Sequence, residues 1–256
     1  MLDVAPRPLP TAADRSAVPG ILPVAAENLV FEAGGRRLID GIDLTLRAGT
    51  RTVVIGPNGA GKSLLLRLLH GLIRPTAGAI SWAGRPADRE VRRRQAMVFQ
   101  RPVLLRRSTA ANMRYALRAN GVRGAALGRR VEDWMRRADL LDLTRRPARV
   151  LSGGEQRRLA VARALSPEPE VLFLDEPTAS LDPASTLAIE DLIQRAHGAG
   201  TKVVLVTHDL GQARRFADEI VFLCRGRVEE VSPAASFFGR PRSDKAQAFV
   251  DGRIVL

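Results

Sequence analysis

The sequence has one cysteine, few aromatic residues and no long apolar run. The single cysteine, Cys224, excludes a disulfide within the chain and fits a reducing compartment. No stretch approaches the roughly 18 consecutive apolar residues that a membrane-spanning helix needs. Residues 1–23 lack the basic and apolar segments of a secretory signal and have the composition of a disordered leader. We therefore expect the chain to work inside the cell without crossing a membrane itself.

Lysine is also scarce, occurring only three times, so arginine carries almost all of the net charge of +13. Such a charge fits a partner that is nucleic acid, anionic lipid or nucleotide phosphate. Arginine spread over solvated helix faces would give the same charge. Aromatic residues make up 4% of the chain, with one tyrosine, and leave few platforms for stacking bases. The composition therefore argues against a nucleic-acid partner.

Strand and helix patterns alternate along the chain. Strands are expected within residues 27–55 and at 79–83, 96–100, 171–174, 202–207 and 220–224. Helical patterns cover 62–73, 155–165 and a segment that begins with Asp182 as N-cap and Pro183 in its first turn. This alternation predicts an α/β fold with a mixed, largely parallel sheet core.

Residues 101–150 have a different sequence pattern, with two arginine-rich amphipathic helical patterns at 108–120 and 125–140. Trp134 and Met135 are the expected anchors of this stretch. We interpret it as a helical subdomain inserted into one domain that spans residues 24–240. Residues 241–256 are expected to form a short C-terminal tail.

A glycine-rich phosphate-binding loop is predicted between a strand and a helix. The sequence Gly56-Pro57-Asn58-Gly59-Ala60-Gly61-Lys62-Ser63 matches the pattern G-x-x-x-x-G-K-[ST] at every fixed position, and Leu64 follows it. Glycines let consecutive backbone N–H groups turn toward a polyphosphate, and the following helix points its positive end at the same anion. In this pattern Lys62 reaches the β- and γ-phosphates and the Ser63 hydroxyl binds Mg²⁺.

Two carboxylates follow the apolar strand at 171–174. Asp175 is placed to hold Mg²⁺ through its water shell, and Glu176 is placed to orient and deprotonate an attacking water. One carboxylate at a strand end is common by chance. A second one, downstream of a phosphate loop with room for both strands in one sheet, predicts phosphoryl chemistry.

Two further polar residues end predicted strands. Gln100 precedes the helical insertion, where a neutral amide can bind Mg²⁺ and sense its presence between two subdomains. His208 follows the strand at 202–207, on the rim where phosphoryl chemistry would occur. By themselves, a strand-end glutamine is usually solvated and a single histidine is usually structural.

A second anion-binding helix start is predicted at Ser152-Gly153-Gly154, before the helix at 155–165. Two such sites in one chain can serve one nucleotide only if the fold brings them together. The alternative is that two chains pair head to tail and each completes the other's site.

Taken in order, these strings resemble the ATP-binding cassette family. The resemblance spans residues 26–240: phosphate loop, Gln100, the signature Leu151-Ser152-Gly153-Gly154-Glu155-Gln156, the acidic strand 171–176, Ser180-Leu181-Asp182 and His208. It implies the P-loop ATPase fold of that family, with ATP and Mg²⁺ as cofactors and Glu176, His208 and Gln100 as catalytic residues. It also implies a head-to-tail dimer around two ATP molecules. Ser152, Gly153, Gly154 and Glu155 would contact the partner's nucleotide, and Asp182 would connect the two sites.

One position departs from the family pattern. Similar cassettes usually place an aromatic ring against adenine just before the first glycine of the turn between two early strands, where this chain has Ala33. Phe31 lies two residues earlier and shares a face of the same strand. Phe31 is therefore the candidate for stacking on adenine.

The segment 97–108 resembles that of tungstate uptake cassettes, with phosphate and amino-acid importer cassettes next. The resemblance implies an importer subunit on the cytoplasmic face of the plasma membrane. Its partners would be separate permease subunits and, indirectly, a solute-binding protein. An exporter subunit has the same motifs. A soluble cassette acting on DNA or ribosomes usually carries two cassettes or a long coiled-coil insertion, and this sequence has neither.

Overall fold

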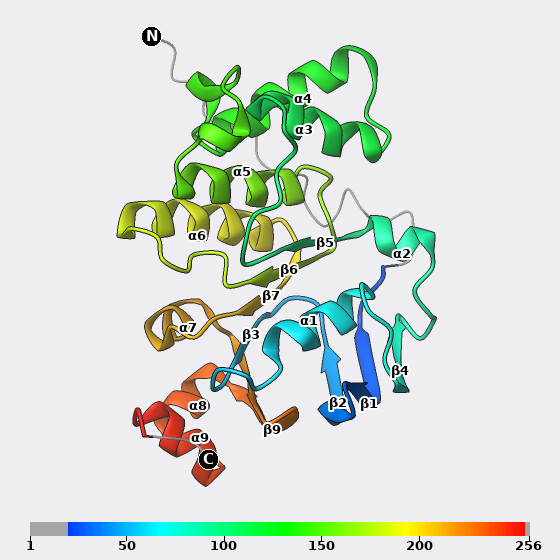
Figure 1. Ribbon diagram of the computed structural model, residues 1–256, viewed down its shortest axis with the longest axis vertical. Helices are drawn as coiled ribbons and strands as arrows, with labels where there is room; N and C mark the ends of the chain where they lie inside the picture. Colours follow the sequence, from blue (N-terminus) through cyan, green and yellow to red (C-terminus); the bar gives the residue numbers. More distant parts are fainter. Residues whose placement is uncertain (1–19, 254–256) are drawn as a thin grey trace.

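A six-stranded sheet forms the centre of the computed structural model, which describes residues 20–253 (Figure 1). Its strands lie in the order β5 (Gln95–Val98), β6 (Val171–Asp175), β7 (Lys202–Val206), β3 (Arg51–Ile55), β8 (Glu219–Cys224) and β9 (Arg227–Pro233). The first five strands are parallel and β9 runs antiparallel to β8. The expected fold class is confirmed. Most of the predicted leader, residues 1–19, lies outside the described residues, whereas Ile21 is fully buried.

The parallel strands are mostly apolar because both faces of this sheet are covered. Side chains alternate between two hydrophobic clusters: Leu172 and Leu174 of β6 face one, whereas Val171 and Phe173 face the other. The first cluster includes residues of the helices α5 (Gly153–Leu165) and α6 (Pro183–Gly198). The second includes residues of α1 (Lys62–His70). Packing on both faces fixes the strand ends from which the candidate site is built.

A smaller antiparallel sheet completes the second cluster, with strand order β2 (Arg36–Leu46), β1 (Val24–Ala33) and β4 (Ala77–Trp82). The helix α2 (Arg89–Arg93) follows β4. Helix α1 was expected to reach Ile73 but ends at His70. Gly71 adopts a left-handed conformation with φ of 78° and donates its N–H to the last carbonyls of the helix.

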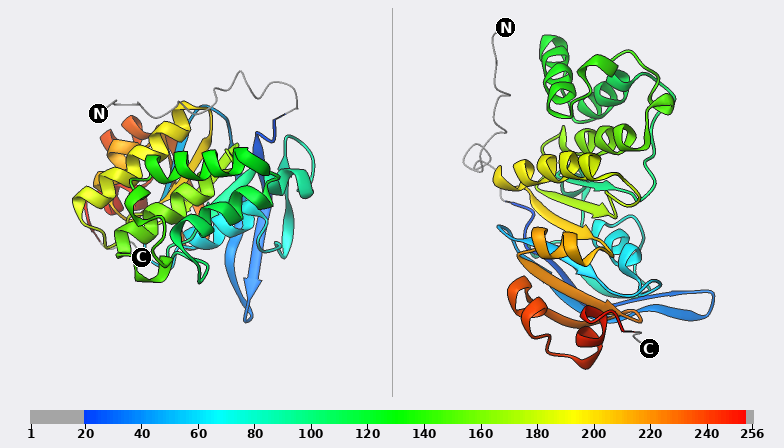
Figure 2. Two further views of the ribbon diagram at one scale, coloured as in Figure 1. Left: turned by 90° about the horizontal axis from the view of Figure 1, so that it is seen from above. Right: turned by 90° about the vertical axis from the view of Figure 1, so that its left-hand side faces the viewer.

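Further helices extend the molecule beyond α5 (Figures 1 and 2). They are α3 (Thr109–Ala119) and α4 (Gly124–Arg137), followed by the 3-10 helices Leu141–Leu143 and Ala148–Val150. These elements occupy the predicted helical subdomain. The expected anchors Trp134 and Met135 are both buried. Helix α6 begins as expected, with Asp182 as N-cap and Pro183 as first helical residue.

The C-terminal part has more structure than the expected strand and short tail. Helix α7 (Leu210–Phe216) precedes β8, and α8 (Ala234–Gly239) and α9 (Asp244–Val250) follow β9. The Phe249 ring of α9 lies 5.3 Å from that of Phe222 in β8. Glu230 in β9 accepts a hydrogen bond of 2.9 Å from the backbone of Arg242 and so ties the approach to α9 to the sheet. None of the helices within residues 20–253 is long and apolar enough to span a bilayer.

Lys202 is a buried lysine at the start of β7, only 1% exposed. Its Nζ donates to the Thr50 carbonyl, the Thr50 hydroxyl and the Thr52 hydroxyl at 2.7–2.8 Å. Burial lowers its pKa from 10.5 to about 8, although Glu219 and Asp218 act in the opposite direction. The fold therefore disfavours the protonated amine, and this penalty is fully present below pH 8.

The free energy of unfolding should therefore rise between about pH 8 and pH 10.5, by about 3 kcal/mol from Lys202 alone. In the Lys202→Met variant this part of the rise should be missing. Urea unfolding of both proteins across that range measures the difference, with Lys245→Met, at an exposed ion pair with Glu229, as control. Equal pH dependence of the wild type and Lys202→Met would contradict the prediction.

Candidate active site

The phosphate-binding loop connects β3 to α1 and depends on two of its glycines. Gly56 has φ of 151°, and a Cβ atom there would lie 1.9 Å from the Leu223 carbonyl oxygen of β8. Gly61 has φ of 101°, and its Cβ would lie 2.9 Å from the Ile39 side chain of β2. Any side chain at Gly56 would displace the backbone of β8. The loop is thus held between two sheets in one conformation.

Lys62 lies in the first turn of α1 with its amine folded over the loop. Its Nζ donates to the carbonyl oxygens of Gly56 at 2.7 Å and Pro57 at 2.9 Å. Burial lowers the pKa of Lys62, and the carboxylates Glu176 and Asp175 partly offset this effect. The ammonium group therefore lies where the loop's backbone and the start of α1 converge. Asn58 and Gly59 at the loop tip are exposed, whereas Ala60 is buried and Leu64 is half-buried.

Asp175 and Ser63 meet across the start of α1. The Ser63 hydroxyl donates to Asp175 Oδ1 at 2.7 Å, and the Asp175 residue is only 1% exposed. Burial raises the pKa of Asp175, whereas the Ser63 hydrogen bond and the nearby Arg67 lower it. A hydroxyl and a carboxylate are oxygen ligands of the kind that Mg²⁺ prefers. A cation beside Asp175 would offset the cost of burying its charge.

Glu176 is held by the two polar strand-end residues that the sequence singled out. Gln100 Nε2 donates to Glu176 Oε2 at 3.0 Å, and His208 Nδ1 lies 3.1 Å from Glu176 Oε1. The strand order β5, β6, β7 explains the contact, since Glu176 follows the middle strand and the other two follow its neighbours. Each carboxylate oxygen thus has one partner. The structure brings Gln100, Glu176 and His208 together.

The backbone of Glu176 is strained. Its φ of 47° lies in the left-handed region, which costs on the order of 1–3 kcal/mol for a residue other than glycine. The next residue is Pro177, which further disfavours helical conformations at the residue before it. The carbonyl oxygen of Glu176 accepts a hydrogen bond of 2.7 Å from Arg157 Nη1. No sequence pattern points to Arg157, because its contact with Glu176 depends on how α5 packs beside the end of β6.

The signature forms the start of α5 rather than preceding it, because Ser152 is the N-cap and the helix begins at Gly153. The Ser152 hydroxyl accepts from the Glu155 N–H, and the Glu155 carboxylate accepts from the Ser152 N–H at 2.6 Å. This capping box leaves Ser152 and Gly153 exposed. Helices α5 and α1 pack against different clusters on opposite faces of the sheet. The signature and the phosphate loop are therefore carried by separate layers of the chain.

The starts of α5 and α6 lie side by side. A Cβ atom at Gly154 would lie 2.4 Å from the Ser185 hydroxyl, so a larger residue there would require the Ser185 side chain to move. Asp182 caps α6, accepting from the Ser185 N–H at 2.9 Å. Hydrogen bonds to Ser185 hold the pKa of Asp182 below its usual value. Of the residues predicted to face a second copy, Ser152, Gly153 and Asp182 lie exposed at these neighbouring helix starts, whereas Gly154 is buried.

Phe31 lies on β1 directly opposite Ile39 of β2. Its ring is half-buried and packs against the second hydrophobic cluster, whereas Ala33 is exposed. Because Ile39 also contacts the phosphate loop at Gly61, Phe31 lies one strand away from that loop. Its stacking on adenine stays a prediction.

Comparison with known proteins adds the family. Residues 39–179 match the family model described as ABC transporter. A probable anion import ATP-binding protein from Haloferax volcanii is 37% identical, covering 91% of this chain and 88% of that protein. The tungstate uptake system ATP-binding protein of Peptoclostridium acidaminophilum is 39% identical over 81% of this chain and 97% of that protein. A phosphate import ATP-binding protein from Natronomonas pharaonis is 37% identical, covering 86% of this chain and 84% of that protein.

Solved structures agree in fold. The ATP-binding subunit of an ABC transporter superposes with a TM-score of 0.79 at 26% identity, covering 90% of this chain and 100% of that one. A dimeric ATP-binding cassette in a post-hydrolysis state, bound to ADP and Pi, superposes with a TM-score of 0.75 at 28% identity. The match covers 82% of this chain and 98% of that one. The chain therefore belongs to the ABC transporter family and is an ATP-hydrolysing, ATP-binding subunit of the importer type.

Proposed function

We propose that this ATPase powers the import of a small oxyanion, such as tungstate, through separate membrane subunits. The observation that carries the hydrolytic part is the convergence of Gln100, Glu176 and His208 beside the phosphate loop. The cargo is supported by the resemblance of residues 97–108 to tungstate cassettes and by relatives named for anion, tungstate and phosphate import. The alternatives are a phosphate or amino-acid importer, since a relative named for methionine import is 38% identical.

ATP binds with its phosphates in the loop at residues 56–63. Backbone N–H groups and the start of α1 surround the anion, and Lys62 exchanges its bonds to the loop carbonyls for phosphate oxygens. Mg²⁺ would be held by the Ser63 hydroxyl and by Asp175 through water, with Gln100 as a further ligand, and would neutralise charge on the phosphates. Few protein ligands suffice, because Mg²⁺ is usually bound by one or two carboxylates together with phosphates and water.

Glu176 activates the water that attacks the γ-phosphate. Its carboxylate is held between Gln100 and His208, so that an incoming water meets a base with fixed orientation. The water's proton passes to Glu176 as its oxygen attacks the phosphorus, and ADP leaves with the electrons of the broken bond. His208 is 59% exposed in its side chain and so is free to turn toward the γ-phosphate.

A second copy completes each site in head-to-tail fashion. The start of α5, where Ser152 and Gly153 are exposed, Glu155 is half-buried and Gly154 is buried, presents backbone N–H groups and a helix end to the partner's γ-phosphate. Asp182 at the neighbouring start of α6 connects the two sites. The arrangement of α1 and α5 on opposite faces of the sheet favours this reading over one nucleotide bridging both motifs within one chain.

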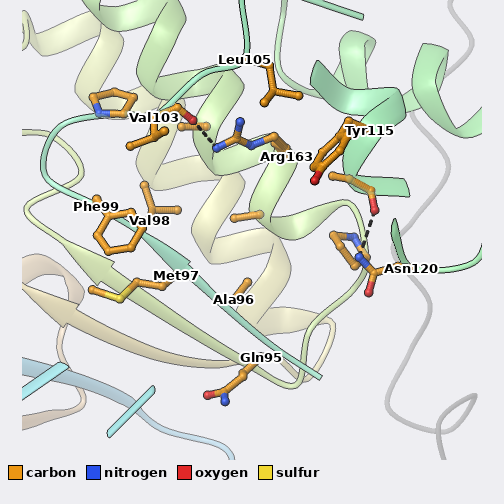
Figure 3. Close-up of a pocket in the computed structure, with 15 residues that line it drawn as sticks. Gln95, Ala96, Met97, Val98, Phe99, Val103, Leu105, Tyr115, Asn120 and Arg163 are labelled. Carbon is orange, nitrogen blue, oxygen red and sulfur yellow. Dashed lines mark hydrogen bonds between the residues drawn. The ribbon is translucent and has the colours of Figure 1, made fainter. Parts of the chain in front are cut away.

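The membrane partner docks in a groove between β5 and the helical subdomain (Figure 3). The groove measures about 450 Å³ and is mostly apolar. Val103 is 67% exposed and Tyr115 is 56% exposed at its rim, and Arg163 crosses it to the Val103 carbonyl at 2.6 Å. Exposed Arg101, Arg106 and Arg107 continue from the groove and suit an acidic cytoplasmic helix of a permease. In this proposal the chain works at the cytoplasmic face of the plasma membrane, and a solute-binding protein is its indirect partner.

Purification of the chain with its membrane subunits tests the cargo. In proteoliposomes containing the solute-binding protein, tungstate should stimulate ATP hydrolysis more than phosphate or methionine at equal concentration. Movement of the helical subdomains on closure would link that stimulation to transport. Stimulation by phosphate or methionine alone would identify that solute as the cargo in place of tungstate. Stimulation by a solute on the cytoplasmic side would indicate export rather than import.

A further inference from the structure

Arg157 connects the signature helix to the backbone of the proposed catalytic base. It lies on α5, five residues after the N-cap Ser152, and its Nη1 donates to the Glu176 carbonyl oxygen at 2.7 Å. Burial lowers the pKa of Arg157, and the Glu176 carboxylate partly offsets this effect. The half-buried guanidinium of Arg157 makes a directional, charge-assisted hydrogen bond to the Glu176 carbonyl oxygen. Such a bond restrains the position of the Glu176 backbone.

Glu176 needs such a restraint because its conformation is unfavourable by itself. With φ of 47° before a proline, the residue would relax toward an extended conformation if it were free. Relaxation would swing its side chain away from the two strand-end partners, Gln100 and His208. The carboxylate would then no longer be aligned between them.

Three backbone contacts in the described residues oppose this relaxation. The Glu176 N–H donates to the Val206 carbonyl at 3.0 Å, and the Glu176 carbonyl also accepts from Ala179 at 3.3 Å. Those two contacts belong to the sheet and to the turn that follows it. The contact from Arg157 is the shortest of the three and comes from the helical layer. It therefore ties the conformation of Glu176 to the position of α5.

We propose that Arg157 is a positioning residue that aligns Glu176 and makes its alignment depend on the start of α5. The inference rests on the proposed role of Glu176 as base. Because α5 is a rigid helix, Ser152 and Arg157 move together over about 7.5 Å of its length. When the exposed signature end of α5 docks on a second copy's nucleotide, α5 moves as a unit. Arg157 then moves with the helix and determines the position of the Glu176 carbonyl. Engagement at one ATP site is thereby transmitted to the base of the other.

The test compares Arg157→Met, Arg157→Lys and a matched surface arginine, Arg195→Gln, whose partner Asp191 lies one turn away on α6. For Arg157→Met, kcat for ATP should fall about 10- to 100-fold while KM for ATP stays within about twofold. Arg157→Lys should recover part of kcat, since it keeps the charge. Arg195→Gln should match the wild type. In the Glu176→Gln background, Arg157→Met should still form the ATP-dependent dimer.

Wild-type kcat in Arg157→Met, with Glu176→Gln inactive, would overturn this inference and leave the proposed function standing. Hydrolysis by Glu176→Gln itself would instead overturn the assigned base. Should Arg157→Met fold poorly, Arg157→Gln is compared after correction for the fraction that binds ATP. A loss of activity that only follows the folded fraction, or a rise in KM equal to the fall in kcat, would also overturn the inference.

Discussion

Glu176→Gln is expected to bind ATP normally and to hydrolyse it about 10²- to 10⁴-fold more slowly than the wild type. The amide has nearly the shape of the carboxylate, so its oxygen still accepts from Gln100, at 3.0 Å in the native protein. It cannot take a proton from water at neutral pH, so only the basic function is lost. Because hydrolysis no longer resets the closed state, ATP should accumulate in a stable dimer.

Gel filtration with ATP and Mg²⁺, together with phosphate release, measures both effects. The control is Glu132→Gln, a change at an exposed ion pair with Arg136 on α4, which should leave turnover unchanged. Turnover of Glu176→Gln at the wild-type rate would remove Glu176 from the mechanism. Full-speed hydrolysis by a strictly monomeric preparation would contradict the two-copy site.

Lys62→Ala should weaken ATP binding by about 1.5–3 kcal/mol, or about 10- to 150-fold in Kd. The loss follows from removing a charged donor that lies over the loop within 2.9 Å of two of its carbonyl oxygens. Without the amine, the Gly56 and Pro57 carbonyls would also lose a hydrogen-bond donor. The loop should then bind phosphate more weakly. Hydrolysis should fall at least as much as affinity, because Lys62 is also expected to contact the phosphate that is transferred.

Calorimetric titration with ATP in the presence of Mg²⁺ checks this second prediction. Lys245→Ala serves as the matched control, since its amine pairs with Glu229 at the surface near the C-terminus. Circular dichroism establishes that both variants are folded. Unchanged ATP affinity in folded Lys62→Ala would contradict the assignment of the loop.

The local features of the site could be predicted because each is encoded by neighbouring residues. The strand before Gly56 and the helix from Lys62 follow from β-branched and leucine-rich patterns, and both are present. Asp182 and Pro183 predict the start of α6 for the same reason. The predicted end of helix α1 at residue 73 lies three residues beyond the observed end at His70, because Gly71 takes up a left-handed conformation and caps α1.

Features that depend on pairing between distant segments were not predicted. Strand β9 has a weak pattern with two adjacent glutamates, and it becomes a strand because β8 offers it an edge. Helix α9 is fixed by Phe249 against Phe222, a contact between residues far apart in the chain. The contact of Arg157 with Glu176 likewise depends on α5 packing beside the end of β6. Sequence periodicity carries no information on any of these three.

By itself the sequence predicted the chemical groups: a phosphate loop, a serine and an aspartate proposed as metal ligands, a proposed base, and a second helix start suited to an anion. It could do so because short strings fix backbone conformation and donor type locally. Only the tertiary structure decided that Gln100 and His208 bond to opposite oxygens of Glu176, and that the signature lies on a different layer from the phosphate loop. Those facts follow from strand order and from the two faces of the sheet, which arise when the whole chain packs at once.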